Sequence, residues 1–223
     1  MRGLFDYPKK AHFGRMVAKG KIYDRAKPSR KIQENFVTQI AKITWAYKLA
    51  PETINLTARP GVQEIGIFEL MLKGDDLDHN ILKSIDKAIV HPIIFHVIKG
   101  QQIKVMATYK RPSEADSHKW VIGEMYLASD WMPLDADKQP LPIALDMANL
   151  YERLLREILP IDAREDEELL NQIERFEKIL SKENEQKRLE SRIDKEKQFN
   201  RKVEVNAKLR MLASDIQKLK GVE

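Results

Sequence analysis

The chain lacks cysteine altogether, and this absence excludes several kinds of chemistry. None of its 223 residues is Cys, so it forms no disulfide and has no thiolate to act as a nucleophile or a zinc ligand. A reducing compartment suits such a chain. The five histidines, at positions 12, 79, 91, 96 and 118, are scattered. We therefore expect neither a metal site nor a cofactor.

Clustered glycine is also missing, which argues against nucleotide-dependent enzymes. Loops that cradle phosphate need closely spaced glycines, so that backbone N–H groups can approach the anion. The nine glycines of this chain are dispersed, and neither G-x-x-x-x-G-K-[ST] nor G-x-G-x-x-G occurs. Long apolar runs are absent too, so no segment of membrane-spanning length is expected. We expect a cytoplasmic protein without contact to a membrane.

The C-terminal segment, residues 161–223, contains no proline and, up to Lys220, no glycine. Glu, Lys, Arg, Gln, Leu and Ala dominate it, which predicts one unbroken coiled-coil-like helix of roughly 90 Å. Apolar residues form two blocks with alternating spacings of three and four, typical of helix pairing. We predict that these residues mediate assembly: Leu169, Ile173, Phe176, Leu180, Val205, Leu209, Leu212, Ile216 and Leu219.

The two apolar blocks are out of register, because Val205 lies one residue beyond five heptads from Leu169. Charged residues fill the stretch between them. The helix would pair with another copy of the chain, pair with a different protein, or fold back on itself. A solvated charged tail is the remaining interpretation.

Positive charge gathers in the N-terminal segment, residues 1–31. It contains ten Lys or Arg and two Asp, interleaved with Phe5, Tyr7, Phe13 and Tyr23. Such a pattern suits an arm that contacts nucleic-acid phosphates, although an irregular solvated terminus has the same composition. We predict these nucleic-acid-binding residues: Lys9, Lys10, Arg15, Lys19, Lys21, Arg25, Arg30, Lys110 and Arg111. For Lys110 and Arg111 the alternative is edge charge that discourages strand aggregation.

Residues 32–160 are expected to form the folded head. Apolar periodicity predicts helices over 32–49, 75–89 and a segment ending at 159, and strands over 62–73, 92–99, 103–111 and 120–127. Gly100 marks a hairpin between two of the strands. The fold class is therefore α+β, with a mostly antiparallel four-stranded sheet and covering helices.

A metal-dependent nuclease is the enzymatic alternative, with Glu69, Lys73 and Lys110 as its weak catalytic candidates. Such a site needs carboxylates to hold the metal and a lysine beside the attacking water. Glu69 and Lys73 are spaced to share one face of a strand. However, Thr108 stands where an acid would be needed near Lys110, and an ordinary strand with polar positions on its exposed face is the favoured explanation of the pattern.

Six stretches carry a resemblance to a known family: FDYPKK at 5–10, APETINL at 50–56, IDKAI at 85–89, HPIIF at 91–95, YKRPSEAD at 109–116 and KQFNRKVE at 197–204. The chain resembles domain-of-unknown-function family 4391 over essentially its whole length. The resemblance implies no activity. It implies genomic neighbours that look like helicase-type ATPases and DNA methyltransferases, in restriction or antiviral defence clusters.

These observations lead to one main hypothesis and two alternatives. The main hypothesis is a non-catalytic assembly or DNA-contacting subunit of a prokaryotic DNA-targeting defence or restriction-modification complex. Its partners would be itself or another protein through the C-terminal helix, a helicase-type ATPase, and DNA. The alternatives are the divergent metal-dependent nuclease and a pure adaptor for protein–protein interaction that docks on an ATPase.

Overall fold

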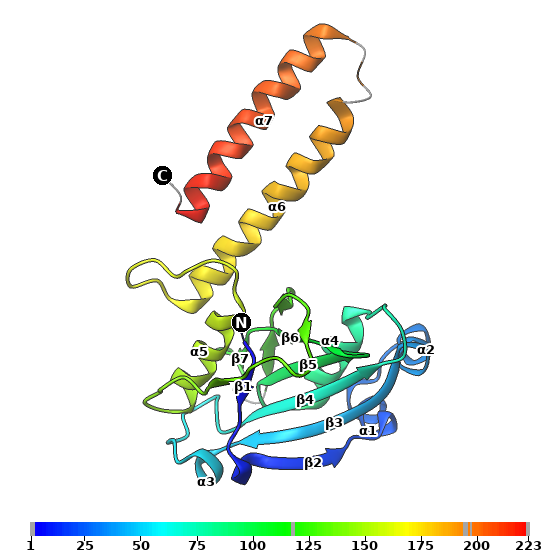
Figure 1. Cartoon of the computed structure of the whole chain (residues 1–223), viewed down its shortest axis with the longest axis vertical. Coiled ribbons are helices and arrows are strands. Elements are labelled where there is room, and N and C mark those ends of the chain that lie inside the picture. Colours follow the sequence, from blue (N-terminus) through cyan, green and yellow to red (C-terminus); the bar gives the residue numbers. More distant parts are fainter. Residues whose placement is uncertain (1–2, 117–118, 194–195, 197, 222–223) are drawn as a thin grey trace. The chain divides into compact units, whose positions relative to one another are not determined.

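The computed structural model describes residues 3–116, 119–193, 196 and 198–221 (Figure 1). Arg2 of the basic segment and Lys197 of the last family-like stretch lie outside these residues. The chain divides into two compact units, Met1–Pro160 and Ile161–Glu223. None of the helices in the described stretches has the length and apolarity needed to span a bilayer.

The first unit is built on a seven-stranded sheet in the order β10-β6-β5-β4-β3-β2, with β9 also paired to β6. Its strands are β2 (His12–Met16), β3 (Ile40–Leu49), β4 (Ile65–Leu72), β5 (Ile93–Lys99), β6 (Gln102–Ala107), β9 (Leu127–Ala128) and β10 (Met132–Pro133). Neighbouring strands are antiparallel except β4 and β5, which are parallel and are connected through helix α4 (His79–Ala88). The prediction of a mostly antiparallel α+β fold is confirmed, whereas the number of four strands is wrong.

The helix predicted over 32–49 is wrong in its second half. Helix α2 (Arg30–Gln39) ends at Gln39, and the chain continues directly as β3. Ile43 pairs with Leu70 and Trp45 with Phe68, and the register shifts between Trp45 and Tyr47. Five of the ten residues in β3 are β-branched or aromatic, which favours a strand once neighbouring strands are available. The apolar spacing of the segment fits both structures.

The remaining elements follow the predictions more closely. β4, α4, the β5–β6 hairpin with Gly100 at φ 56°, and helix α5 (Met147–Ile158) are confirmed. The strands predicted over 103–111 and 120–127 are both divided. β6 ends at Ala107, β7 (Lys110–Pro112) pairs with β8 (Trp120–Ile122) away from the main sheet, and β9 joins β6. The other short elements are β1 (Phe5–Asp6), which pairs with β11 (Gln139–Pro140), the 3₁₀ helix η1 (Lys9–Ala11), α1 (Lys19–Ala26) and α3 (Pro51–Ile54).

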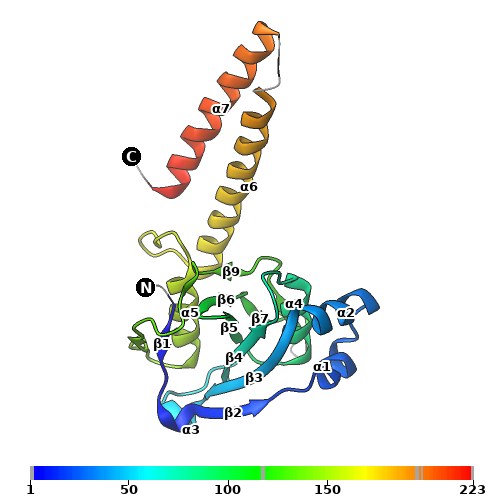
Figure 2. The same ribbon diagram turned by 45° about the vertical axis from the view of Figure 1, so that its right-hand side comes forward.

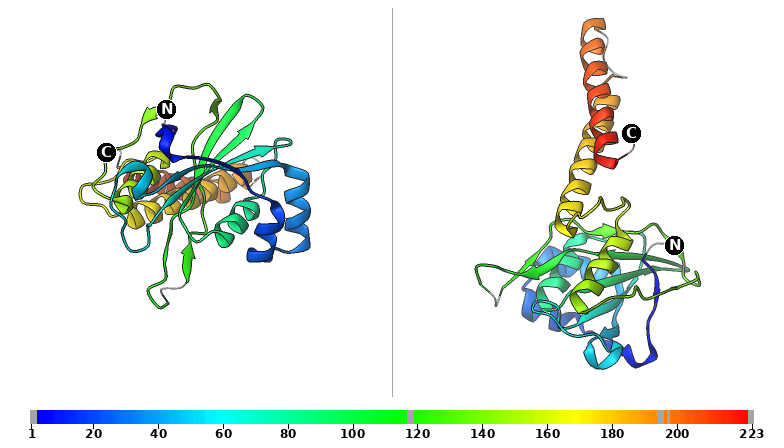
Figure 3. Two further views of the ribbon diagram at one scale, coloured as in Figure 1. Left: turned by 90° about the horizontal axis from the view of Figure 1, so that it is seen from below. Right: turned by 90° about the vertical axis from the view of Figure 1, so that its left-hand side faces the viewer.

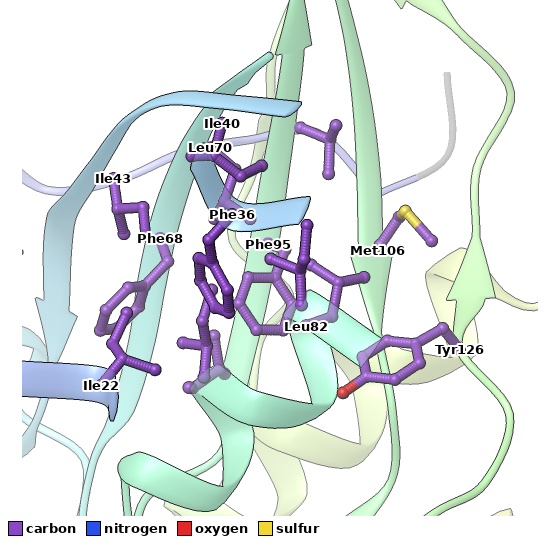
Figure 4. Packing of buried hydrophobic residues seen from close by; sticks show 14 of the residues in the cluster. Ile22, Phe36, Ile40, Ile43, Phe68, Leu70, Leu82, Phe95, Met106 and Tyr126 are labelled. Atoms are coloured by element: carbon purple, nitrogen blue, oxygen red, sulfur yellow. The ribbon is translucent and has the colours of Figure 1, made fainter. Parts of the chain in front are cut away.

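One face of the sheet is covered by α1, α2 and α4, which lie on the same side of it (Figure 3). Ile22 of α1, Phe36 of α2 and Leu82 of α4 meet Phe68 and Phe95 of the sheet there (Figure 4). Each fully buried side chain of this size stabilises the fold by roughly 1.5–3 kcal/mol. This cluster is the core between that face of the sheet and its helices.

The second unit is a helical hairpin, so the single unbroken helix is wrong and the fold-back arrangement is the one observed. Helices α6 (Leu169–Ile193) and α7 (Phe199–Lys220) run antiparallel, side by side (Figure 2). Ile161, Ile179 and Ile216 form its buried cluster, with Phe176 and Leu219 packed against them. Of the predicted seam, Leu169, Ile173, Leu212 and Ile216 are buried, and Phe176, Leu180, Val205, Leu209 and Leu219 are half-buried.

Arg175 holds the base of this hairpin together. Its guanidinium donates to both carboxylate oxygens of Glu167, at 2.8 and 2.7 Å, and to the carbonyls of Leu219 and Asp162. It therefore ties α6 to the preceding segment and to the C-terminal end of α7, where cations are favoured. Hydrogen bonding from Arg175 lowers the pKa of Glu167 to about 2.

Candidate functional site

A hollow of about 500 Å³ opens between β2, α1, β3 and the C-terminal end of α4. Its lining combines apolar, aromatic and basic side chains: Phe13, Arg15, Met16, Val17, Lys21, Ile22, Asp24, Arg25, Trp45, Ala88 and Ile89. We call it the β2–α1 pocket. Its volume lies within the roughly 300–1,000 Å³ that small-molecule sites occupy.

A column of aromatic rings, with Phe13 tilted by 55° against Trp45, runs from the core to the wall of this pocket. Phe68 stacks on Trp45 with ring centroids 5.2 Å apart, and Trp45 lies 4.7 Å from Phe13. The guanidinium of Arg15 lies over the Phe13 ring, 4.6 Å from its centroid. The Trp45 indole is fixed by its N–H, which donates to the Tyr47 carbonyl at 2.9 Å. The column thus ends in an exposed, pre-positioned cation above an aromatic ring.

The local sequence explains why Phe13 and Arg15 reach this position. Gly14 between them has φ 62°, and the pairing of β2 with β3 shifts register between His12 and Arg15. This is a β-bulge with glycine at the position that needs a left-handed backbone. A Cβ at Gly14 would stand 2.7 Å from the His12 ring. Bulges at sheet edges commonly redirect side chains, as this one does.

Three basic residues around the pocket leave their charges unpaired. In the described part of the chain, Arg15, Lys21 and Arg25 form no ion pair with a carboxylate, whereas Lys48 and Lys83 do. Arg25 donates to the Ala88 carbonyl at 3.4 Å, and all three side chains are exposed. Asp24 is the single acid in the lining. The pocket therefore carries an excess of two positive charges, available to an anion.

The structure distributes the other basic candidates over different roles. Lys19 donates to the carbonyls of Phe36 and Ile40 at 2.8 and 2.6 Å, so it closes the C-terminal end of α2. Arg30 pairs with Glu34, and Arg111 with Glu114. Lys9 and Lys10 are exposed on η1, which precedes β2. Only Arg15, Lys21 and Arg25 among the predicted cations line the pocket.

Lys110 is the most deeply buried of the predicted cations, with a side chain 1% exposed. Its ammonium donates to the carbonyls of Asp86, Ile89 and His91, at the end of α4. The Asp86 carboxylate lies 3.7 Å away and accepts from the Tyr126 hydroxyl at 2.6 Å. Burial lowers the pKa of Lys110 to about 8 and raises that of Asp86 to about 6. This cluster fixes the α4–β5 connection and is closed to a macromolecular ligand.

The three nuclease candidates are held by three different sets of partners. Glu69 lies between Thr44 and His96 in the sheet register, on the face opposite Phe68 and Leu70. The Lys73 ammonium donates to the Val37 carbonyl at 2.7 Å, and Lys110 is enclosed as described. Within the described residues no group of three or more His, Asp or Glu is arranged to hold a metal.

The sequence does not predict the positions of two residues that contribute to these sites, Trp45 and Glu64. Trp45 was assigned to a helix, although the alternation Ile43, Trp45, Tyr47 is a strand signal. Glu64 lies 3.3 Å from the His91 ring and 3.2 Å from Lys48. Burial lowers the pKa of His91, and Glu64 opposes this. No sequence motif pairs these residues, because the contacts join separate strands and loops.

Comparison of the chain with known protein families finds one family to which it is similar. The model of the family described as Domain of unknown function (DUF4391) matches residues 5–216. The chain belongs to this family. Neither a curated protein nor a solved structure matches the chain. The DUF4391 match includes the residues of the β2–α1 pocket and most of the helical hairpin.

Proposed function

We propose that this chain is a non-catalytic subunit that holds nucleic acid in a prokaryotic DNA-targeting defence or restriction-type assembly. One observation carries the proposal: three unpaired cations surround a pocket that also presents a fixed aromatic column. Basic side chains contact phosphates irrespective of sequence, and aromatic faces accept bases of any kind. The place in a defence assembly rests on the family resemblance.

The combination of basic and aromatic side chains in the lining favours a ligand that has both a negative charge and an aromatic group. A purely acidic partner would use the cations but would leave Phe13 and Trp45 without a role. An uncharged aromatic ligand would not compensate Arg15, Lys21 and Arg25. Nucleic acid satisfies both requirements, because each nucleotide combines a phosphate with a base.

The test measures binding of full-length protein to labelled single-stranded and duplex DNA by fluorescence anisotropy over a range of salt concentrations. The Arg15→Gln/Lys21→Gln/Arg25→Gln variant removes three cations from the pocket. For a single strand each lost phosphate contact reduces the salt slope by about 0.7, so the triple variant should reduce it by about 2.

The matched control is Lys187→Gln/Arg188→Gln/Arg192→Gln, which removes the same charge from exposed positions of α6. It should bind DNA as the unaltered protein does. If the unaltered protein binds no DNA, or if both variants lose binding equally, nucleic-acid binding at the pocket is refuted. Absence of all DNA binding would favour the adaptor alternative.

A further inference from the structure

We infer that the β2–α1 pocket receives one unpaired nucleotide, with its base stacked on the Arg15–Phe13 column and its phosphate at Lys21 and Arg25. This inference rests on the proposed function and specifies which form of nucleic acid the site takes. It also specifies what the site does not read, namely the identity of the base.

The shape of the pocket selects a single nucleotide over a duplex. The hollow of about 500 Å³ is the size of a small-molecule site. The accessible apolar part of its lining includes Phe13 and Val17, which are half-buried, and Met16, which is 73% exposed. An apolar surface of this kind suits a base that has left its stack, whereas the paired bases of a duplex stay inside the double helix.

The column supplies the stacking surface before any ligand arrives. Phe13 is held against Trp45, and Trp45 is held by Phe68 and by its hydrogen bond to Tyr47. Bases stack on aromatic rings and on guanidinium planes alike. A base can therefore stack on the Arg15 guanidinium where the Phe13 ring holds it in place. Because the column is fixed, little side-chain freedom is lost on binding.

Apart from its three cations, which we assign to stacking and to phosphate contact, the lining contains few groups able to read a base edge. It includes no Asn, Gln, Ser or Thr, and these residue types usually read base edges together with Arg. The Ala88 carbonyl already accepts from Arg25, and the Ile89 carbonyl from Lys110. Only the Asp24 carboxylate remains as a side-chain acceptor. The site should accept all four bases with similar affinity.

The experiment compares two single strands of equal charge on full-length protein. One is an oligothymidylate of about ten nucleotides, and the other is an abasic strand with the same number of phosphates. We expect the oligothymidylate to bind about fivefold to tenfold tighter, which corresponds to the lower part of the range for stacking one base on an aromatic side chain. A blunt duplex of similar length should not outcompete it.

Two kinds of variant separate stacking from charge. Phe13→Leu should bring the affinity ratio of the two strands close to one without changing the salt slope, and Phe13→Tyr should keep the ratio. Lys21→Gln should weaken both strands equally and reduce the slope. Thermal melting followed by tryptophan fluorescence verifies that each variant is folded.

Each outcome bears on a different claim. If the unaltered protein binds neither strand, the proposed function itself is refuted. If it binds both strands equally, or if Phe13→Leu keeps the ratio, nucleic-acid contact stands and the nucleotide pocket is refuted. If one homopolymer binds more than tenfold tighter than the other three, the claim that the base is not read is wrong.

Discussion

At the residue scale, Lys110 has a structural role, although its position at the end of a predicted strand suggests an exposed side chain. A lysine at the end of a strand is ordinarily exposed, but this ammonium is enclosed by three carbonyl groups, Asp86 and the ring of Trp120, whose centroid is 5.6 Å away. Taking a charge out of water is costly unless hydrogen bonds and an opposite charge compensate it. Here both are present, so the ion pair persists inside the core.

Replacing Lys110 by Met should destabilise the first unit by about 3–5 kcal/mol, because Asp86 and the α4 carbonyls lose their buried partner. Urea unfolding followed by tryptophan fluorescence measures this, since Trp45, Trp120 and Trp131 all lie in Met1–Pro160. The control Lys87→Met changes an exposed lysine of α4, the helix that carries Asp86. It should change the free energy of unfolding by less than about 1 kcal/mol. The double variant Lys110→Met/Asp86→Asn should recover part of the loss. Equal stability of the Lys110 and Lys87 variants would contradict this account.

At the scale of elements, local pattern and tertiary pairing disagree in two places. Residues 40–49 have apolar spacing that suits a helix, yet they form β3 because β2 and β4 offer hydrogen-bonding partners on both sides. Residues 161–220 suit a single helix, yet the chain reverses between α6 and α7. Antiparallel return brings the two apolar blocks together although their heptads are out of register, and it also pairs Lys182 with Asp215 and Lys220 with Glu183.

The hairpin should be sensitive to acid through Glu167. Its pKa is lowered to about 2 from an ordinary 4.5, so its stabilising contribution is present above pH 4.5 and is lost as the pH falls toward 2. Arg175→Met should remove this dependence and cost about 2–3 kcal/mol at neutral pH. Hydrogen exchange of the α7 amides measures this loss of stability. We expect these amides to exchange at least about tenfold faster in the Arg175→Met variant than in the unaltered protein.

Lys182→Met is the matched control for this prediction. It removes an ion pair that is partly exposed on both sides, and such pairs contribute between about 0 and 1 kcal/mol. Exchange in α7 should therefore change little. If both variants exchange alike, or if the Arg175 variant keeps the acid sensitivity, Arg175 and Glu167 do not hold the hairpin as described.

At the scale of the whole molecule, the hairpin changes the expectation about self-association. The residues that predicted helix pairing between chains are buried or half-buried within one chain. A stable dimer commonly buries about 1,200–2,000 Å², and this seam is no longer free to supply such an interface. The large apolar side chains that stay exposed on α7 include Val203 and Met211, which are 51% and 70% exposed.

Light scattering should accordingly return the mass of one chain for the purified full-length protein across a wide range of concentrations. The reason is that the apolar seam residues of α6 and α7 are buried or half-buried within the hairpin of a single chain. A dimer mass that disappears when residues 161–223 are deleted would contradict this expectation, and it would restore pairing between chains. The residue 1–160 truncation should keep its tryptophan-monitored unfolding transition, because its core lies entirely within that unit.

Sequence alone determined the α+β class, the α4 and α5 helices, the β5–β6 hairpin, the helical C-terminal segment and the excess of basic residues near the N-terminus. These features depend on composition and on contacts between residues close in sequence, which periodicity reports directly. The match to DUF4391 could likewise be anticipated from short stretches of sequence.

Only the tertiary structure decided which basic residues remain available and which are consumed. Lys19 and Lys110 neutralise helix ends, whereas Arg15, Lys21 and Arg25 surround a pocket together with Trp45, some twenty or thirty residues further along the chain. The reason is physical. A charge, an aromatic ring or an apolar stripe acquires its role from partners distant in sequence, and only the folded chain brings those partners within contact distance.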